Sequence, residues 1–124
     1  MVEPKQTRRI GEYGEAVVAD HLRQQGYDIL ETQFRTRFGE IDIVARSPEG
    51  ILCFVEVKTR NNASFALARE AVTPTKQRRI RTTAQRYLCL YGDMDTLCRF
   101  DVAEVYVGNG TTQPWVHYIE QAFT

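Results

Sequence analysis

The chain has 124 residues, of which 43% are hydrophobic and 26% are charged, a composition that excludes a disordered, collagen-like or fibrous protein. Its length suits a single domain, residues 1–124, that buries a core without the support of disulfides or metals. The longest apolar run has five residues, too few to cross a bilayer, and the first residues contain no apolar secretory segment. We therefore expect a cytoplasmic protein that makes no contact with a membrane.

Charge is balanced over the chain but not along it. Sixteen basic and sixteen acidic residues cancel, so the net charge indicates no partner. The stretch from Ala71 to Gly92 holds five cations and no acid: Lys76, Arg78, Arg79, Arg81 and Arg86. A local basic face can bind phosphate on a neutral molecule. From charge alone, a solvated helix face is an equally good reading.

The first half of the chain predicts one helix and three strands. Residues 11–25 read as a helix ended by Gly26, with Val18, Ala19 and Leu22 on one face. Residues 27–35, 40–46 and 51–60 read as strands, and a Ser-Pro-Glu-Gly turn at 47–50 joins the last two. These elements predict a three-stranded meander after one helix.

The second half predicts a helix and two further strands. Residues 61–71 read as a loop with a short helix. Thr73 then caps a helix that begins at Pro74 and ends near Tyr91. Its expected buried stripe is Ile80, Ala84, Tyr87, Leu88 and Tyr91.

Residues 97–107 predict a strand parallel to an earlier one, and residues 115–123 predict a last strand after a Gly-Asn-Gly turn at 108–110. The order αβββαβ, with this additional strand, predicts an α/β domain in which helices flank a central mixed β-sheet.

Strand residues alternate between faces, so Ile41 and Ile43 should share one face of the predicted hairpin and Glu40 and Asp42 the other. Folding it about the turn matches apolar with apolar and charged with charged positions: Ile43 with Val55, Ile41 with Val57, Asp42 with Glu56, and Glu40 with Lys58. Two carboxylates directly opposite lie about 5 Å apart at Cβ and repel each other. A shared proton, a cationic side chain or a divalent cation would compensate. Oxygen ligands of this kind suit Mg²⁺ or Mn²⁺.

Glu15 and Lys76 lie on the apolar stripes of the two predicted helices, at helical spacing from buried positions. A charged side chain there is uncommon unless it is paired or coordinated. The alternative for each is a side chain that reaches solvent at a helix end. For the strands, the alternative is an exposed charged face with an ordinary pair between Glu40 and Lys58.

These motifs resemble the PD-(D/E)xK nuclease superfamily and, within it, the YraN-like bacterial family. The matching segments cover about residues 11–103. They are Gly14-Glu15, Gly26-Tyr27, Gly39-Glu40-Ile41-Asp42, residues 54–60 (FVEVKTR), residues 72–74 (VTP) with Lys76, and Arg99-Phe100-Asp101. The sequence departs from the pattern at Ile41, which replaces a proline, and at Gln33, where relatives often carry Asn.

The resemblance implies a restriction endonuclease-like fold and a Mg²⁺- or Mn²⁺-dependent endonuclease that acts on DNA, with branched or structured DNA as a candidate substrate. By the same resemblance, Asp42 and Glu56 would hold the metal, with the backbone carbonyl of Val57 as a further ligand. Lys58 would orient or activate the attacking water, and Glu15 would hold a second metal or its water.

The expected contacts to DNA phosphates are the basic side chains near this site: Arg35, Arg37, Arg60, Lys76, Arg78, Arg79 and Arg81. One site cuts one strand, so a homodimer through the aromatic segment 115–123 is a further expectation. Two other functions stay open. One is a nucleic-acid-binding module that is inactive or active only with a partner, and the other is a scaffold that binds no metal.

Overall fold

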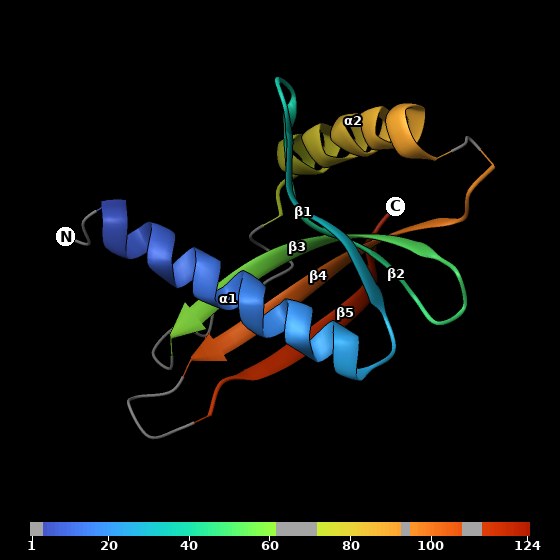
Figure 1. Cartoon of the computed structure of the whole chain (residues 1–124). Coiled ribbons are helices and arrows are strands. Elements are labelled where there is room, and N and C mark those ends of the chain that lie inside the picture. The colour runs from blue at the N-terminus through green and yellow to red at the C-terminus, as the bar shows by residue number, and fades with distance from the viewer. Residues whose placement is uncertain (1–3, 62–71, 93–94, 108–112) are drawn as a thin grey trace.

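The computed structural model describes residues 4–61, 72–92, 95–107 and 113–124, and in them two helices flank one five-stranded sheet (Figure 1). The elements are α1 (Pro4–Gln24), β1 (Asp28–Thr36), β2 (Gly39–Arg46), β3 (Leu52–Asn61), α2 (Pro74–Tyr91), β4 (Cys98–Val107) and β5 (Trp115–Phe123). No helix among these residues is long and apolar enough to cross a membrane. The predicted mixed α/β class is confirmed.

The sheet follows chain order, β1-β2-β3-β4-β5. Neighbouring strands are antiparallel except β3 and β4, which run parallel with α2 in the connection between them. The predicted meander and the parallel crossover are therefore confirmed. The segment expected to form a loop with a short helix, residues 62–71, and the turn at 108–110 lie outside the described residues.

Each face of the sheet has its own apolar core. On one face α1 buries Val18, Ala19 and Leu22 against side chains of β2, β3 and β4. On the other face α2 packs its apolar stripe against alternate residues of the same strands. This strict alternation, with Phe54 on the α2 side and Val55 on the α1 side, is the period of two of a sheet buried on both faces.

Helix α2 begins where the sequence predicts. The Thr73 side chain accepts a hydrogen bond from the Lys76 N–H, and Pro74 occupies the first turn. Two details of its buried stripe differ from expectation. Thr83 is fully buried and satisfies its hydroxyl on the Arg79 carbonyl at 2.8 Å, whereas Tyr91 is 64% exposed at the last turn. Helix α1 also starts earlier than predicted, because the polar segment before Gly11 continues the helix back to Pro4.

The alternation breaks at Asp42. Ile41 belongs to the α2 core and Ile43 to the α1 core, so the prediction that they share a face is wrong. The break coincides with an irregular position on the neighbouring strand: Gln33 has a φ of 53°, and Gln33 and Asp42 do not pair in the β1–β2 ladder, although the register is the same on both sides of them. Asp42 consequently lies at the point where β2 turns from one face of the sheet to the other.

Helix α1 packs closely against β3 at Gly14 but not at Gly11. A Cβ at Gly14 would lie 2.0 Å from Thr59 Oγ1, whereas a Cβ at Gly11 would meet nothing within 4 Å. We predict that Gly14→Ala lowers the free energy of unfolding by roughly 1–3 kcal/mol through steric conflict. Gly11→Ala should raise it by about 0.5–1 kcal/mol through helix propensity. Urea unfolding measures both, and equal stabilisation by the two substitutions would contradict the close α1–β3 contact.

Candidate functional site

A pocket of about 500 Å³ opens between the start of β2, the middle of β3 and the first turn of α2. Carboxylate side chains of two strands and an ammonium of the helix line it together. Its lining residues are Gly39, Glu40, Asp42, Glu56, Thr73, Thr75, Lys76, Arg79 and Ile80. Both predicted metal ligands of the strands therefore meet two of the predicted phosphate contacts, Lys76 and Arg79, in one cavity.

The Asp42 side chain takes the place of a backbone hydrogen-bond acceptor for β3 where β2 separates from it. The β2–β3 ladder pairs Ile43 with Val55, as predicted, and that is the last pair before the strands separate. Beyond it the Asp42 side chain accepts the Val57 N–H at 2.8 Å. This bond satisfies a strand amide that would otherwise lose its partner, and it fixes the Asp42 carboxylate beside β3.

The environment of Asp42 disfavours its charge. Burial raises the pKa of Asp42 to about 8, and the negative charge of Glu56 adds to this rise. The hydrogen bond from Val57 acts in the opposite direction and does not outweigh them. A carboxyl group in this state is stabilised by a proton or by a cation placed next to it.

The Glu56 carboxylate forms ion pairs with two lysines. Its side chain is 7% exposed, and its Oε1 lies 2.5 Å from Lys76 Nζ and 3.4 Å from Lys58 Nζ. The alternative pairing of Glu40 with Lys58 is not observed, because β2 and β3 have separated at this point. Glu40 Oε1 instead accepts a hydrogen bond from Arg35 Nε at 3.1 Å and forms an ion pair with it.

The two lysines differ in how firmly they hold their protons. Burial lowers the pKa of Lys58, and the neighbouring Lys76 ammonium lowers it further. Burial also opposes the charge of Lys76, but contact with the Glu56 carboxylate outweighs it and raises the pKa of Lys76. Lys58 is therefore the lysine that releases a proton more readily.

Glu15 reaches the same point from the opposite face of the sheet. Its Oε2 accepts a hydrogen bond from Gln33 Nε2 at 3.0 Å, and its carboxyl group contacts that of Asp42. Burial is the main cause that raises the pKa of Glu15. The switch of face at Asp42 thus allows one aspartate to meet Glu15 from α1 and Glu56 from β3.

The donor set fits a hard divalent cation in chemistry, although it is not a complete cage. In the described part of the chain, no group of three or more His, Cys, Asp or Glu side chains is arranged to hold a metal ion. Asp42 and Glu56 supply carboxylate oxygens to one pocket, in which burial and, second, the charge of Glu56 raise the pKa of Asp42. Oxygen donors with open positions for water are what Mg²⁺ uses in substrate-binding sites.

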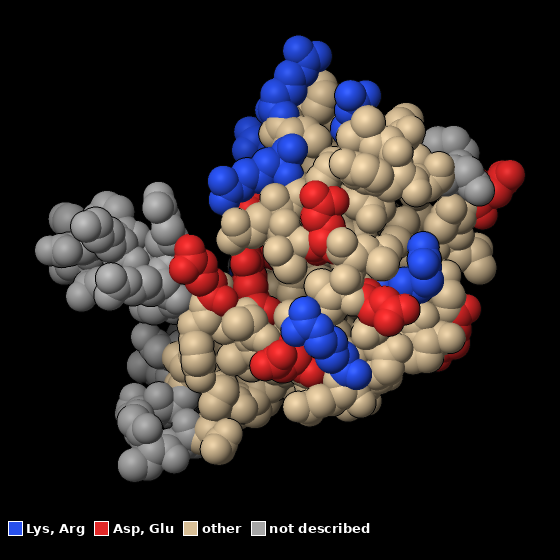
Figure 2. Space-filling view, viewed as in Figure 1, with Lys and Arg blue, Asp and Glu red and all other residues tan. Residues whose placement is uncertain are grey.

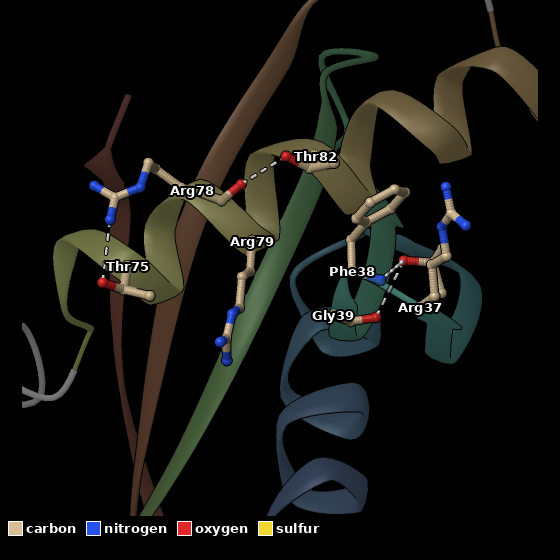
Figure 3. Close-up of a pocket in the computed structure, with 8 residues that line it drawn as sticks. Arg37, Phe38, Gly39, Thr75, Arg78, Arg79 and Thr82 are labelled. Carbon is tan, nitrogen blue, oxygen red and sulfur yellow. Dashed lines mark hydrogen bonds between the residues drawn. The ribbon is translucent and has the colours of Figure 1, made fainter.

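Arginines continue outward from this pocket. A groove of about 650 Å³ runs between the β1–β2 hairpin tip and α2, lined by Arg37, Arg78 and Arg79 (Figure 3). A second groove, of about 640 Å³, lies between the end of β1, the hairpin tip and the second half of α2, and its lining includes Arg35, Arg37 and Arg86. Figure 2 shows basic side chains gathered over the hairpin and α2 region of the molecule. Arg79 lines both the first groove and the carboxylate pocket, which are therefore adjacent.

Two of the predicted phosphate contacts lie elsewhere. Arg81 donates to the Thr124 carbonyl at 3.0 Å and lines none of these cavities. Arg60 extends from β3, and its buried Nε and Nη2 atoms have no hydrogen-bond partner among the described residues. Lys76 contacts Glu56 inside the pocket and does not line the groove.

Arg86 lines the second groove but is not among the phosphate contacts predicted from sequence, although it belongs to the basic stretch. Its spacing of seven residues from Arg79, two helical turns, was the available signal.

The raised pKa of Asp42 predicts an unusual dependence of stability on pH. Its value is about 8 in the folded protein, against an ordinary value of 3.8. Between about pH 4 and pH 8 the folded protein binds more protons than the unfolded chain, so its free energy of unfolding falls as pH rises through this window. In EDTA, Asp42→Asn should flatten this decline and raise the Tm at pH 8 by about 3–8 °C.

Thermal unfolding followed by circular dichroism across this pH range measures the effect. The matched control is Asp20→Asn, which removes a carboxylate whose side chain is 72% exposed and should leave the pH profile unchanged. Parallel profiles for the unaltered protein and Asp42→Asn would contradict the account of this carboxyl group.

Comparison with known proteins places the chain in a family. The protein-family sequence model described as "Uncharacterised protein family UPF0102" matches residues 14–105 of the chain. A UPF0102 protein of Alkaliphilus metalliredigens is 41% identical over 94% of this chain and 99% of the relative. One of Acetivibrio thermocellus is 48% identical over 81% and 77%, respectively. The chain belongs to family UPF0102, the YraN family that its motifs resemble.

Proposed function

We propose that this protein is a metal-dependent endonuclease that hydrolyses phosphodiester bonds of DNA. The observation that carries the proposal is the convergence of Asp42 and Glu56 in one pocket, with Lys58 on Glu56, at the inner end of an arginine-lined groove. The carboxylates suit a cation, and the groove suits a phosphate backbone. Both features are what hydrolysis of a phosphodiester requires.

Asp42 and Glu56 would hold Mg²⁺ or Mn²⁺, with Glu15 supporting Asp42 from α1. The ion supplies a more acidic bound water and positive charge for the phosphoryl oxygens. The chain's own contribution begins with Asp42, which the Val57 N–H orients toward β3. Lys76 and Lys58 neutralise Glu56 in the absence of the ion.

Lys58 has the properties of a group that acts on the attacking water. Its side chain is 20% exposed, and its pKa is lowered by burial and by the neighbouring Lys76. A lysine whose pKa is lowered can more readily act as a neutral amine that accepts a proton, and as an ammonium it can stabilise developing negative charge. Lys76 keeps its proton, which suits it to hold Glu56 or a phosphate oxygen by charge.

DNA phosphates would lie along Arg37, Arg78 and Arg79. Such contacts give affinity and position without reading base sequence, which favours recognition of DNA shape. A homodimer through the edge strand β5 would provide a second site for cutting both strands. The alternative function is a binding module on the same surface, in which DNA is held but not cut.

A cleavage panel tests the proposal. Labelled single-stranded, duplex, flap and four-way-junction DNAs are incubated with the protein in Mn²⁺, Mg²⁺ or EDTA. We expect cutting that needs metal and that falls at least about 100-fold in Asp42→Ala, because the carboxylate that orients the ion is lost. Lys58→Ala should also abolish cutting while leaving DNA affinity nearly unchanged. Binding without cutting would support the module instead, and neither binding nor cutting would contradict both functions.

The salt dependence of binding tests the groove. If Arg37 and Arg78 each neutralise one phosphate, the double variant Arg37→Ala/Arg78→Ala should reduce the slope of log K against log salt by roughly 0.7–0.9 for each of the two phosphates. Fluorescence anisotropy in EDTA measures it. Arg81→Ala is the matched control, since this side chain is held by the C-terminal carbonyl and its removal should leave the slope unchanged. Equal slopes for the double variant and the control would contradict the assignment.

A further inference from the structure

The tip of the β1–β2 hairpin presents an aromatic ring between two arginine grooves. The Phe38 side chain is 46% exposed and lines both arginine grooves, the one that contains Arg78 and Arg79 and the one that contains Arg86. Figure 3 shows Phe38 beside Arg37 at the tip, across the groove from Arg78 and Arg79. An exposed ring at this position contributes to neither apolar core among the described residues, and its presence needs another explanation.

The backbone beneath this ring is fixed. The Phe38 N–H donates to Thr36 Oγ1 at 3.1 Å, and the same hydroxyl lies 3.4 Å from Thr83 Oγ1 of α2. Gly39 lets the hairpin approach the helix, because a Cβ there would lie 3.2 Å from Thr83 Oγ1 and 3.3 Å from Arg79 Cβ. Two contacts to α2 thus hold the tip, and Phe38 is presented from a supported position rather than from a free loop.

The surroundings of Phe38 specify the chemistry of its partner. Five arginines line the two grooves, Arg35, Arg37, Arg78, Arg79 and Arg86, and no acidic residue of the described chain lines either. The Arg37 guanidinium lies 4.8 Å from the centroid of the Phe38 ring. A polyanion alone would not use the ring, and an apolar ligand would not use the arginines. A nucleic-acid strand uses both, since it carries phosphates and flat base faces.

The ring further selects the state of that strand. Inside a duplex both faces of each base are covered by neighbouring bases, so an exposed side chain finds no free face to stack on. An unpaired base, or a base at the end of a paired segment, offers one. An exposed ring between two arginine-lined grooves therefore favours a nucleic acid with an unpaired stretch.

We propose that Phe38 stacks on an unpaired base of a DNA strand whose phosphates lie in the two arginine grooves, and that it directs the protein to DNA with a single-stranded segment near the carboxylate pocket. This inference rests on the proposed DNA substrate and names its class. Phe38 is a specificity residue here and takes no part in the hydrolysis itself.

Binding measured in EDTA tests this inference without cleavage. The dissociation constants of a labelled 16-nucleotide single strand and of its duplex are compared for the unaltered protein, Phe38→Ala and Phe38→Tyr. Phe38→Ala should weaken single-strand binding roughly 5- to 100-fold, with duplex binding and the salt slope unchanged, and Phe38→Tyr should retain affinity. Tyr13→Ala is the matched control and should leave single-strand binding unchanged, because Tyr13 is an aromatic residue 48% exposed on α1 that lines neither groove.

A direct signal comes from the double variant Phe38→Trp/Trp115→Phe, whose one tryptophan then stands at the tip, since the chain has a single Trp. Its fluorescence should be quenched by the single strand and not by the duplex. Equal quenching by both, or equal loss of single-strand and duplex affinity in Phe38→Ala, would overturn the inference, as would the absence of single-strand binding by the unaltered protein. Selective binding by a protein that never cuts DNA would retain the inference and refute the proposed catalysis.

Discussion

The structure depends on one unfavourable arrangement, the burial of the Asp42 carboxyl group in the same pocket as Glu56, at the point where β2 separates from β3. Asp42 is held there because its side chain must satisfy the Val57 N–H that β2 no longer bonds. Burial and, second, the negative charge of Glu56 raise the pKa of Asp42. Two lysines form ion pairs with Glu56, whereas no ion pair to Asp42 occurs among the described residues.

A second buried aspartate shows what full compensation looks like in the same fold. Asp101 is 0% exposed, and its oxygens accept Arg99 Nε at 2.9 and 3.1 Å, Tyr118 Oη at 2.5 Å and the Gln121 N–H at 3.0 Å. Such a carboxylate joins strands and has no bonding capacity to spare for a ligand. Asp42, with one strand amide and two neighbouring carboxyl groups, is the opposite case. The difference in partners separates a structural carboxylate from a candidate ligand more clearly than burial does.

Much of the fold could be predicted from sequence because its signals are local. The Thr73-Pro74 cap, the turn at 47–50 and the alternation in β3 each act within a few residues, and the structure contains all three consequences. The switch of face at Asp42 could not be predicted. It coincides with the left-handed backbone of Gln33 on the neighbouring strand, and a prediction that assumes residue-by-residue alternation does not include such a break.

The candidate site shows the same division between local and tertiary information. Spacing predicts Asp42 directly opposite Glu56; the β2–β3 ladder ends one pair earlier, at Ile43–Val55, so the two side chains share a pocket without being a ladder pair. Helix periodicity predicts that Glu15 and Lys76 lie toward the sheet. That Lys76 takes Glu56, while Glu40 turns to Arg35, depends on the separation of β2 from β3. The basic stretch of α2 likewise did not reveal which of its arginines line the groove. The β1–β2 hairpin packs against one side of that helix, and this contact decides it.

The central claim is that Asp42 and Glu56 form a site for a divalent cation. A crystal structure of the protein grown with Mn²⁺, with anomalous differences recorded at the manganese edge, tests it most directly. The account predicts an anomalous peak within about 2.3 Å of oxygens of both carboxylates, with Lys76 withdrawn from Glu56. A structure in which the pocket holds no peak and Lys76 stays on Glu56 at saturating Mn²⁺ would contradict it.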